Sequence, residues 1–187
     1  MKYRTLLLSG CLVCRMAAAE DSGTVHQFGE TVAPGQGVSL TVARQDAARF
    51  RSEYAREFED ADGALAAFSL QFGGDDVIDF ATDRDDPSHS DIVALCGEQR
   101  VNAFKMGSLR SGDSKTYIFG KPGAFQGKDK LWHSISTGGS PPLVVFFRLP
   151  AACVPAQVRL SAAFEAGEVG KGTKYRLLFA DPPSAKK

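Results

Sequence analysis

The sequence lacks any apolar run of about 20 residues, the length that a helix needs to cross a membrane. We therefore expect a protein without a transmembrane span. It also lacks a dense run of Lys and Arg, and its 22 basic residues are balanced by 22 acidic ones. Since a nucleic-acid-binding protein needs a basic surface to neutralise phosphates, we expect no nucleic-acid partner.

The sequence patterns of common catalytic and cofactor sites are also missing. There is no G-x-S-x-G, no G-x-G-x-x-G and no G-K-[ST]. The three histidines, His26, His89 and His133, lack the close His spacing of a zinc-binding helix. These absences favour a non-enzymatic protein without a cofactor, although a catalytic triad can also assemble from distant residues.

The N-terminal residues are typical of an export signal. Two basic residues precede the apolar run 5–14, and the three alanines 17–19 form a small-residue cleavage site. The pattern predicts a signal peptide over residues 1–19 and a single β-sandwich domain over residues 20–187. The protein would then be secreted or periplasmic.

A second interpretation of the same segment is a lipid anchor. Residues 8–11 (LSGC) resemble the lipobox of bacterial lipoproteins, in which Cys11 would carry the lipid and become the mature N-terminus. Such a lipid would hold the domain at a bacterial membrane without a spanning helix. Both forms of export stay open.

Cleavage after residue 19 would leave two cysteines, Cys96 and Cys153, each at the end of an apolar run. An even number of cysteines in an oxidising compartment favours a disulfide. Neither cysteine has a Cys or His partner at metal-ligand spacing. We therefore predict a Cys96–Cys153 disulfide.

Short apolar runs alternate with Gly, Pro, Ser and Asp along the mature chain, which is typical of a mostly β protein. We predict a two-layer antiparallel β-sandwich or jelly roll. Residues 143–149 (LVVFFRL) are nearly all apolar, which indicates a central strand buried on both faces. Two hairpins are expected, 65–72 with 77–82 and 91–96 with 100–106.

One segment differs from this β pattern. The residues around Phe50, Tyr54 and Phe58 are rich in Ala, Arg and Glu, and these three aromatic residues would share one face of a helix. Asp46 is placed to cap the first turn. The pattern predicts one short helix near residues 46–59 with a core-facing aromatic side, although a strand would also place the three on one face.

Acidic and basic residues are separated along the chain. Residues 20–98 hold 17 acidic and 5 basic residues, whereas residues 99–187 hold 5 acidic and 14 basic residues. Such asymmetry arises from two oppositely charged surfaces or from strands that pair acid against base across a sheet. We favour the second arrangement.

The densest acidic segment suggests a metal site. Asp83, Asp85 and Asp86 supply the carboxylate oxygens that Ca²⁺ prefers, although the spacing is not that of an EF-hand. The plainer interpretation is a solvated turn. With His89 nearby, the same residues would form the site of a secreted hydrolase, possibly metal-dependent, which we keep as an alternative function.

Two Gly-rich loops, 107–113 and 120–130, carry basic residues and one aromatic residue. Loops on a rigid β scaffold commonly carry binding sites, and cationic loops suit an acidic glycan or an acidic protein surface. We predict an exported binding module that contacts a protein or acidic glycan. A secreted effector or inhibitor that acts by protein contact is a further alternative. The expected ligand-binding residues are Lys105, Arg110, Lys115, Lys121, Phe125, Lys128 and Lys130.

Overall fold

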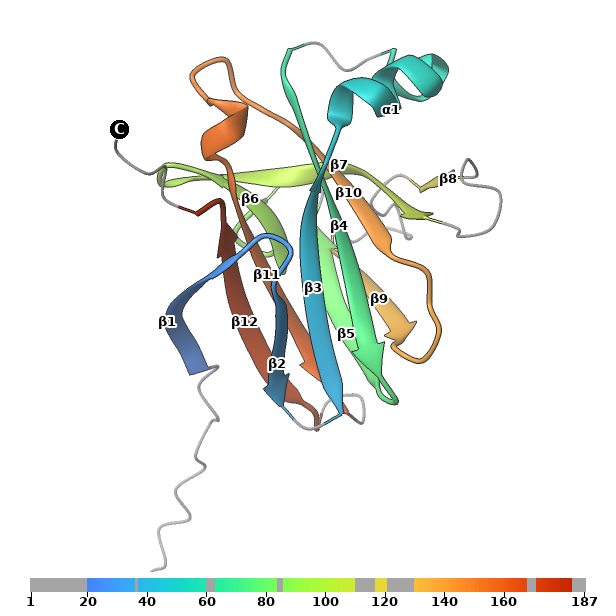
Figure 1. The fold of residues 1–187 in the computed structure, drawn as a ribbon, viewed down its shortest axis with the longest axis vertical. Helices are drawn as coiled ribbons and strands as arrows, with labels where there is room; N and C mark the ends of the chain where they lie inside the picture. Colours follow the sequence, from blue (N-terminus) through green and yellow to red (C-terminus); the bar gives the residue numbers. More distant parts are fainter. Residues whose placement is uncertain are drawn as a thin grey trace, which may run out of the picture.

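The computed structural model describes residues 20–35, 37–59, 63–83, 86–109, 117–120, 130–167 and 171–182. For residues 20–22, 57, 109, 117–120 and 130–132, only the backbone is described. The predicted signal peptide and the lipid-anchor residue Cys11 lie outside these ranges. The fold is mostly β with one short α-helix, which confirms the predicted class (Figure 1).

Twelve strands, one α-helix and two short 3-10 helices make up the described part of the chain. In chain order they are β1 (Glu20–Gln27), β2 (Thr31–Gly35), β3 (Val38–Gln45), α1 (Ala47–Glu53), η1 (Ala55–Phe58), β4 (Leu65–Gly74), β5 (Val77–Asp83), β6 (Ile92–Cys96), β7 (Gln99–Leu109), β8 (Tyr117–Gly120), β9 (Lys130–Ser136), β10 (Leu143–Arg148), η2 (Pro155–Gln157), β11 (Arg159–Ala166) and β12 (Thr173–Ala180).

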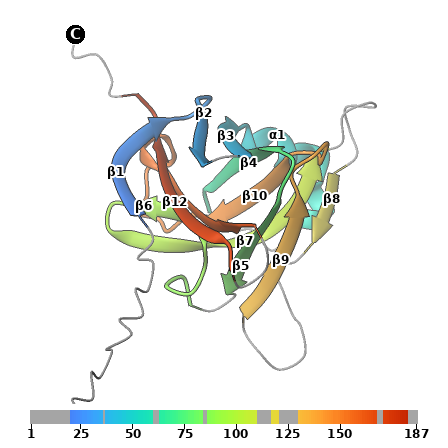
Figure 2. The ribbon, with the colours of Figure 1, turned by 90° about the horizontal axis from the view of Figure 1, so that it is seen from below.

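The strands form one large sheet that curves around the core. The main path runs β1-β12-β11-β6-β7-β10-β4-β3-β2, while β5 pairs with β11 and β9, and β8 pairs with β7. Figure 2 shows the strands arranged around the core, with β1 and β2 at the two ends of this path. All described pairs are antiparallel except β1 with β12, which is parallel. The expected all-antiparallel pairing is therefore wrong at this one pair.

Strand β7 connects two parts of the sheet. Its first residues pair with β6, with Cys96 opposite Gln99, so the predicted hairpin of 91–96 with 100–106 is confirmed. Its later residues pair with β10 on one side and β8 on the other. The register with β10 shifts between Phe146 and Phe147, and such a bulge bends a strand.

The other predicted hairpin is wrong. β4 pairs with β3 and β10, whereas β5 pairs with β9 and β11. The turn between β4 and β5 carries the chain across the core to another part of the sheet. At this turn Gly74 has φ +117, and a Cβ there would collide with the backbone of Gly37. Asp76 N then donates to Thr137 Oγ1 at 2.9 Å, which ties the start of β5 to the end of β9.

The main core lies inside the curved sheet. Alternate residues of β4 face it, namely Phe68, Leu70 and Phe72, and all three are buried. The alternating residues Val158, Leu160, Ala162 and Phe164 at and along β11 are buried in the same cluster.

The helix forms where the sequence predicts it. Asp46 caps α1 by accepting from Ala48 N at 3.0 Å and Arg49 N at 3.2 Å. Phe50 and Phe58 pack against Phe146, in a second cluster apart from the main core. Because one face of β10 meets the main core and the other meets this helical cluster, both faces of the strand are buried, as predicted.

The predicted disulfide is present. Cys96 ends β6 and Cys153 follows β10, and their Cα atoms are 5.7 Å apart. By restricting the unfolded chain, a bridge of this span contributes about 4 kcal/mol of stability in the loop-entropy model. A disulfide is compatible with a secreted or periplasmic protein. Within the described ranges, no helix is long and apolar enough to cross a membrane.

Candidate functional site

The structure describes only part of the predicted site residues. Asp83, Asp86 and Lys105 are described in full, and Lys130 by its backbone. The remaining predicted site residues lie outside the described ranges: Asp85, Arg110, Lys115, Lys121, Phe125 and Lys128. The site that can be built atom by atom is therefore the segment after β5, which we call the acidic turn (Asp83 with residues 86–91).

The acidic turn is shaped by its own carboxylates. Asp83, 6% exposed, accepts a hydrogen bond from Asp86 N at 2.9 Å through Oδ1. Asp86 in turn accepts from Ser88 N at 2.8 Å. Hydrogen bonds from Ser88 hold the pKa of Asp86 below its usual value. Short aspartate side chains that accept from backbone N–H groups two or three residues ahead favour tight turns.

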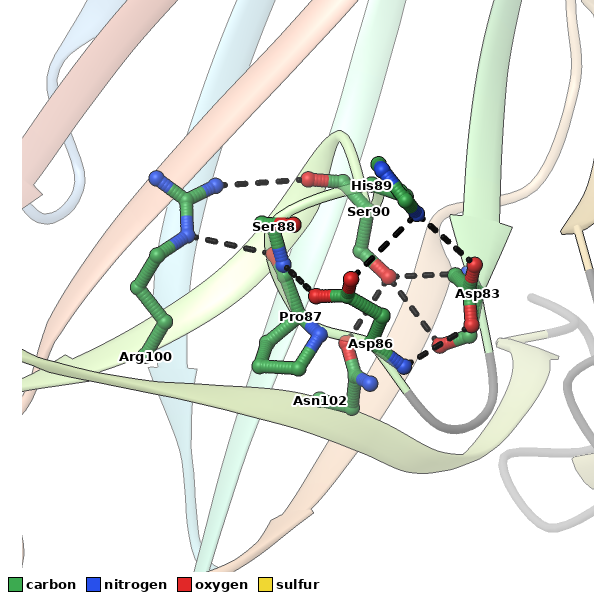
Figure 3. Close-up of polar contacts among 8 residues, drawn as sticks. All are labelled: Asp83, Asp86, Pro87, Ser88, His89, Ser90, Arg100 and Asn102. Carbon is green, nitrogen blue, oxygen red and sulfur yellow. Dashed lines mark hydrogen bonds and ion pairs between the residues drawn. The ribbon is translucent and has the colours of Figure 1, made fainter.

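Ser90 fixes the other end of the turn (Figure 3). Its buried hydroxyl accepts from Asp83 N at 2.8 Å and lies 2.7 Å from Asn102 Oδ1 and 3.1 Å from Asp83 O. A hydroxyl has one proton, so Ser90 donates a hydrogen bond either to Asn102 Oδ1 or to Asp83 O and lies close to the other oxygen without donating to it. This hydroxyl is occupied in holding the turn to β7 and is not placed as a nucleophile.

Arg100 of β7 adds a second connection. Its Nε donates to Pro87 O at 3.1 Å and its Nη2 to Ser90 O at 3.4 Å. A basic residue from the basic half of the chain (residues 99–187) thus forms hydrogen bonds with the carbonyl oxygens of the acidic turn. Sequence reasoning missed Arg100 and Asn102, since only the β6–β7 hairpin brings them beside the turn.

His89 is the one imidazole of the acidic turn. Its Nδ1 lies 3.5 Å from Asp83 Oδ2 and 3.4 Å from Asp86 Oδ2, and its side chain is 63% exposed. In Figure 3 the second ring nitrogen points away from both carboxylates. A carboxylate that contacts one imidazole nitrogen orients the ring. The arrangement therefore presents an oriented imidazole to solvent.

The predicted calcium site gains no support from these contacts. Asp83 uses one oxygen for a backbone N–H, and its other oxygen faces His89. A cation at this position would have to displace the imidazole. Among the residues that the structure describes, no group of three or more His, Cys, Asp or Glu is placed to hold a metal ion. With Asp85 outside the described ranges, the calcium site stays a prediction.

The sheet register brings the acidic and basic candidates together. Asp83, the last residue of β5, stands opposite Lys130, the first residue of β9. The acidic turn and the end of the predicted basic loop therefore meet at one end of the β5–β9 pair. Asp21 likewise stands opposite Arg176 across β1 and β12. These two pairs join an acidic with a basic residue, whereas Asp79 stands opposite Glu165 across β5 and β11, so the sheet follows the favoured arrangement only in part.

Lys105 occupies a different environment. It lies inside β7, and its ammonium group is 5.3 Å from the ring centroid of Phe58. A cation over an aromatic face is stabilised by the ring electrons. Lys105 thus belongs to the helical side of the sheet, while Lys130 belongs to the end that carries the acidic turn.

His133 of β9 packs toward the core. Its ring stacks on Phe80 at 4.8 Å between centroids, and its Nε2 lies 2.9 Å from Thr82 Oγ1. Burial lowers the pKa of His133. The buried Phe80 stands opposite His133 in the register, so His133 occupies a core-facing position of β9.

No protein-family model, curated protein or solved structure matches this chain. The functional argument therefore rests on the residues and their geometry.

Proposed function

We propose that this protein is an exported, non-enzymatic binding module whose binding surface lies at the Asp83–Lys130 end of the β5–β9 pair. The observation that carries the proposal is the register of Asp83 opposite Lys130. It joins the basic loop that ends at residue 130 to a turn fixed by buried hydrogen bonds. A loop attached to such a rigid base is a common form of binding site.

The partner follows from the charge of the loop. Lys121, Lys128 and Lys130 favour an acidic glycan or an acidic protein surface. The acidic turn beside them would repel such a partner locally and so restrict how it docks. Export is supported by the Cys96–Cys153 disulfide and by the signal pattern of residues 1–19.

The first test is a binding screen of the purified protein against neutral and acidic glycans, with and without Ca²⁺. The proposal predicts binding to acidic glycans that weakens as salt increases, because screening reduces the attraction of surface charges. If acidic glycans do not bind, capture of an acidic protein from the compartment where the protein resides would support the protein-partner form. Salt-independent binding to neutral glycans would contradict both forms.

A hydrolase is the second candidate, because His89 is oriented by two carboxylates and presents its other nitrogen to solvent. Such an imidazole can act as a general base toward water. Because the Ser90 hydroxyl is engaged in hydrogen bonds within the turn, water would be the nucleophile in the hydrolysis. Turnover of an ester, phosphate or glycoside substrate that is lost in His89→Gln and retained in Ser88→Ala would favour this function over the binding module.

A further inference from the structure

Strand β9 is attached to the sheet along one side. Among the strands that the structure describes, it pairs with β5, from Lys130 opposite Asp83 to Ser136 opposite Val77. Of its side chains, those at residues 133–136 are described, and none of them is fully buried. A strand with one partner and few buried side chains can open locally without unfolding of the whole protein.

The end of β9 that leads to Thr137 is firmly fixed. Thr137 is 2% exposed, and its backbone N–H donates to Asp76 O at 2.8 Å. Its hydroxyl accepts from Asp76 N at 2.9 Å and donates to Asp76 O at 2.8 Å. Three hydrogen bonds thus hold this end, which can act as a hinge when the Lys130 end of the strand moves.

His133 lies between the two ends of β9, with its ring on the core side. The ring stacks on Phe80, which is fully buried, with 4.8 Å between the centroids. Its Nε2 lies 2.9 Å from the hydroxyl of Thr82, which is 3% exposed. Because both neighbours belong to β5, the imidazole keeps this environment only while β9 stays paired with β5.

The charged residues closest to His133 in the strand pair lie on the other face. Asp79 and Asp83 are the sequence neighbours of the two β5 residues that contact the ring, and side chains alternate between faces along a strand. On that other face Asp79 accepts from the Ser134 hydroxyl. The charged residue of β9 itself is Lys130, three positions away. Within the described parts of β5 and β9, no carboxylate compensates a positive charge on the ring.

The open and closed forms of β9 therefore differ in their affinity for a proton. Burial lowers the pKa of His133 below its ordinary value of 6.5 while the strand is closed. In the open form the ring reaches water and regains the ordinary value, so the open form binds the proton more readily. Its population increases as pH falls below about 6.5. A pKa lowered by one unit would give an increase of up to about tenfold.

We propose that acidification releases the Lys130 end of β9 from β5, with Thr137 as the hinge and His133 as the switch. At neutral pH the strand is closed, and the base of the predicted loop 120–130 is fixed beside the acidic turn. In acid this base loosens, and binding of an acidic partner weakens. The effect on binding rests on the proposed function, whereas the opening of the strand does not.

Amide hydrogen exchange of the full chain at pH 7 and pH 5 tests the opening. After correction for intrinsic exchange rates, the protected amides of residues 131–134 should exchange several-fold faster at pH 5. The amides of Thr137 and of β3 should keep their protection, because the hinge and the main core stay closed. Unchanged protection of residues 131–134 would overturn the proposal. An equal loss of protection in β9 and β3 would show global unfolding and would also overturn it.

Histidine variants assign the switch. His133→Gln can still form a hydrogen bond with Thr82 but does not titrate, so the faster exchange at pH 5 should disappear. His133→Phe keeps a ring against Phe80 and provides the same test if the glutamine variant folds poorly. His89→Gln is the matched control, since it removes an exposed imidazole near the same end and should leave the effect unchanged. A pH effect that persists without His133, or that vanishes without His89, would contradict the proposal.

Affinity measurements separate the switch from the binding surface. Affinity for the acidic glycan or protein found in the screen is compared at pH 7 and pH 5 in His89→Gln, where the exposed imidazole adds no charge near the site. Binding should weaken at pH 5, and it should become insensitive to pH when His133→Gln is added. Faster exchange of β9 at pH 5 with unchanged affinity would support the switch but contradict a binding surface at this end of the pair.

Discussion

The acidic turn and the helical side of the sheet use charged residues in different ways. In the acidic turn, the side chains of Ser90 and Asp83 form hydrogen bonds with the backbone of the turn, and Ser90 also contacts Asn102. On the helical side, Lys105 lies 5.3 Å from the ring centroid of Phe58, and Arg148 lies 5.3 Å from the ring centroid of Phe104. The acidic turn is the denser in charged residues, yet most of that charge maintains local structure. Density of charge in the sequence therefore does not by itself locate a binding surface.

The largest effect should come from Ser90→Ala. The change leaves Asp83 N without its acceptor and removes the hydroxyl beside Asn102 Oδ1 in a buried setting. Such unsatisfied groups cost about 2–3 kcal/mol of unfolding free energy. Denaturant unfolding measures this loss of unfolding free energy. The exposed Ser88→Ala is the matched control, and its unfolding free energy should lie within about 0.5 kcal/mol of wild type. A comparable loss in both variants would show that the turn does not depend on the Ser90 hydroxyl.

A smaller effect is expected from His133, the buried counterpart of His89. Burial lowers the pKa of His133 in the folded protein below its ordinary value of 6.5. The unfolded chain therefore binds the proton more readily, so this group reduces stability as pH falls below about 6.5. Thermal unfolding of wild type and of His133→Gln across pH 5–8 separates this contribution, because histidine titrates in this range. An identical pH dependence in both proteins would contradict the burial of His133.

His89→Gln should change stability less. Its side chain is 63% exposed, so its contacts with Asp83 and Asp86 are screened by water. Exposed ion pairs contribute about 0–1 kcal/mol. Denaturant unfolding at neutral pH should therefore give nearly the wild-type midpoint. A loss as large as that of Ser90→Ala would mean that the imidazole supports the turn and is not simply presented to solvent.

The smallest effect on stability is expected from Arg176→Gln. Because Arg176 is exposed and no hydrogen bond or ion pair joins it to a described side chain, the unfolding free energy should stay within about 0.5 kcal/mol of wild type. A clear loss of stability would show that Arg176 has a structural partner, as the residues of the acidic turn do.

Local sequence patterns predicted much of the fold. The cap at Asp46, the hairpin that ends in Cys96 and the doubly buried strand 143–149 each depend on periodicity or on a nearby turn residue. The Cys96–Cys153 disulfide followed from the number of cysteines left after export. Except for this cysteine count, the signals lie within a few residues of the element that they predict.

Other features depend on contacts that a local pattern does not encode. The Gly-rich turn before Val77 looks like a hairpin turn, but the chain crosses the core there, because β9 and β11 provide the partners of β5. Strand β1 is largely polar and strand β2 has only 5 residues, so alternation did not reveal them. The Asp83–Lys130 register joins residues far apart in the chain and became visible only in the sheet.

The most direct test of the proposed function compares two lysines of the predicted loop 120–130 with two lysines near the Val77 end of β5. Lys121 and Lys128 belong to the loop that ends opposite Asp83, whereas Lys171 and Lys174 lie near the other end, where Gly167 N donates to Val77 O at 3.2 Å. Affinity for the acidic glycan or protein found in the screen is measured for both double alanine variants, which lose equal charge. The account predicts that Lys121→Ala with Lys128→Ala weakens binding strongly while Lys171→Ala with Lys174→Ala leaves it nearly unchanged. Equal affinity in the two variants would contradict a binding surface at the Asp83–Lys130 end.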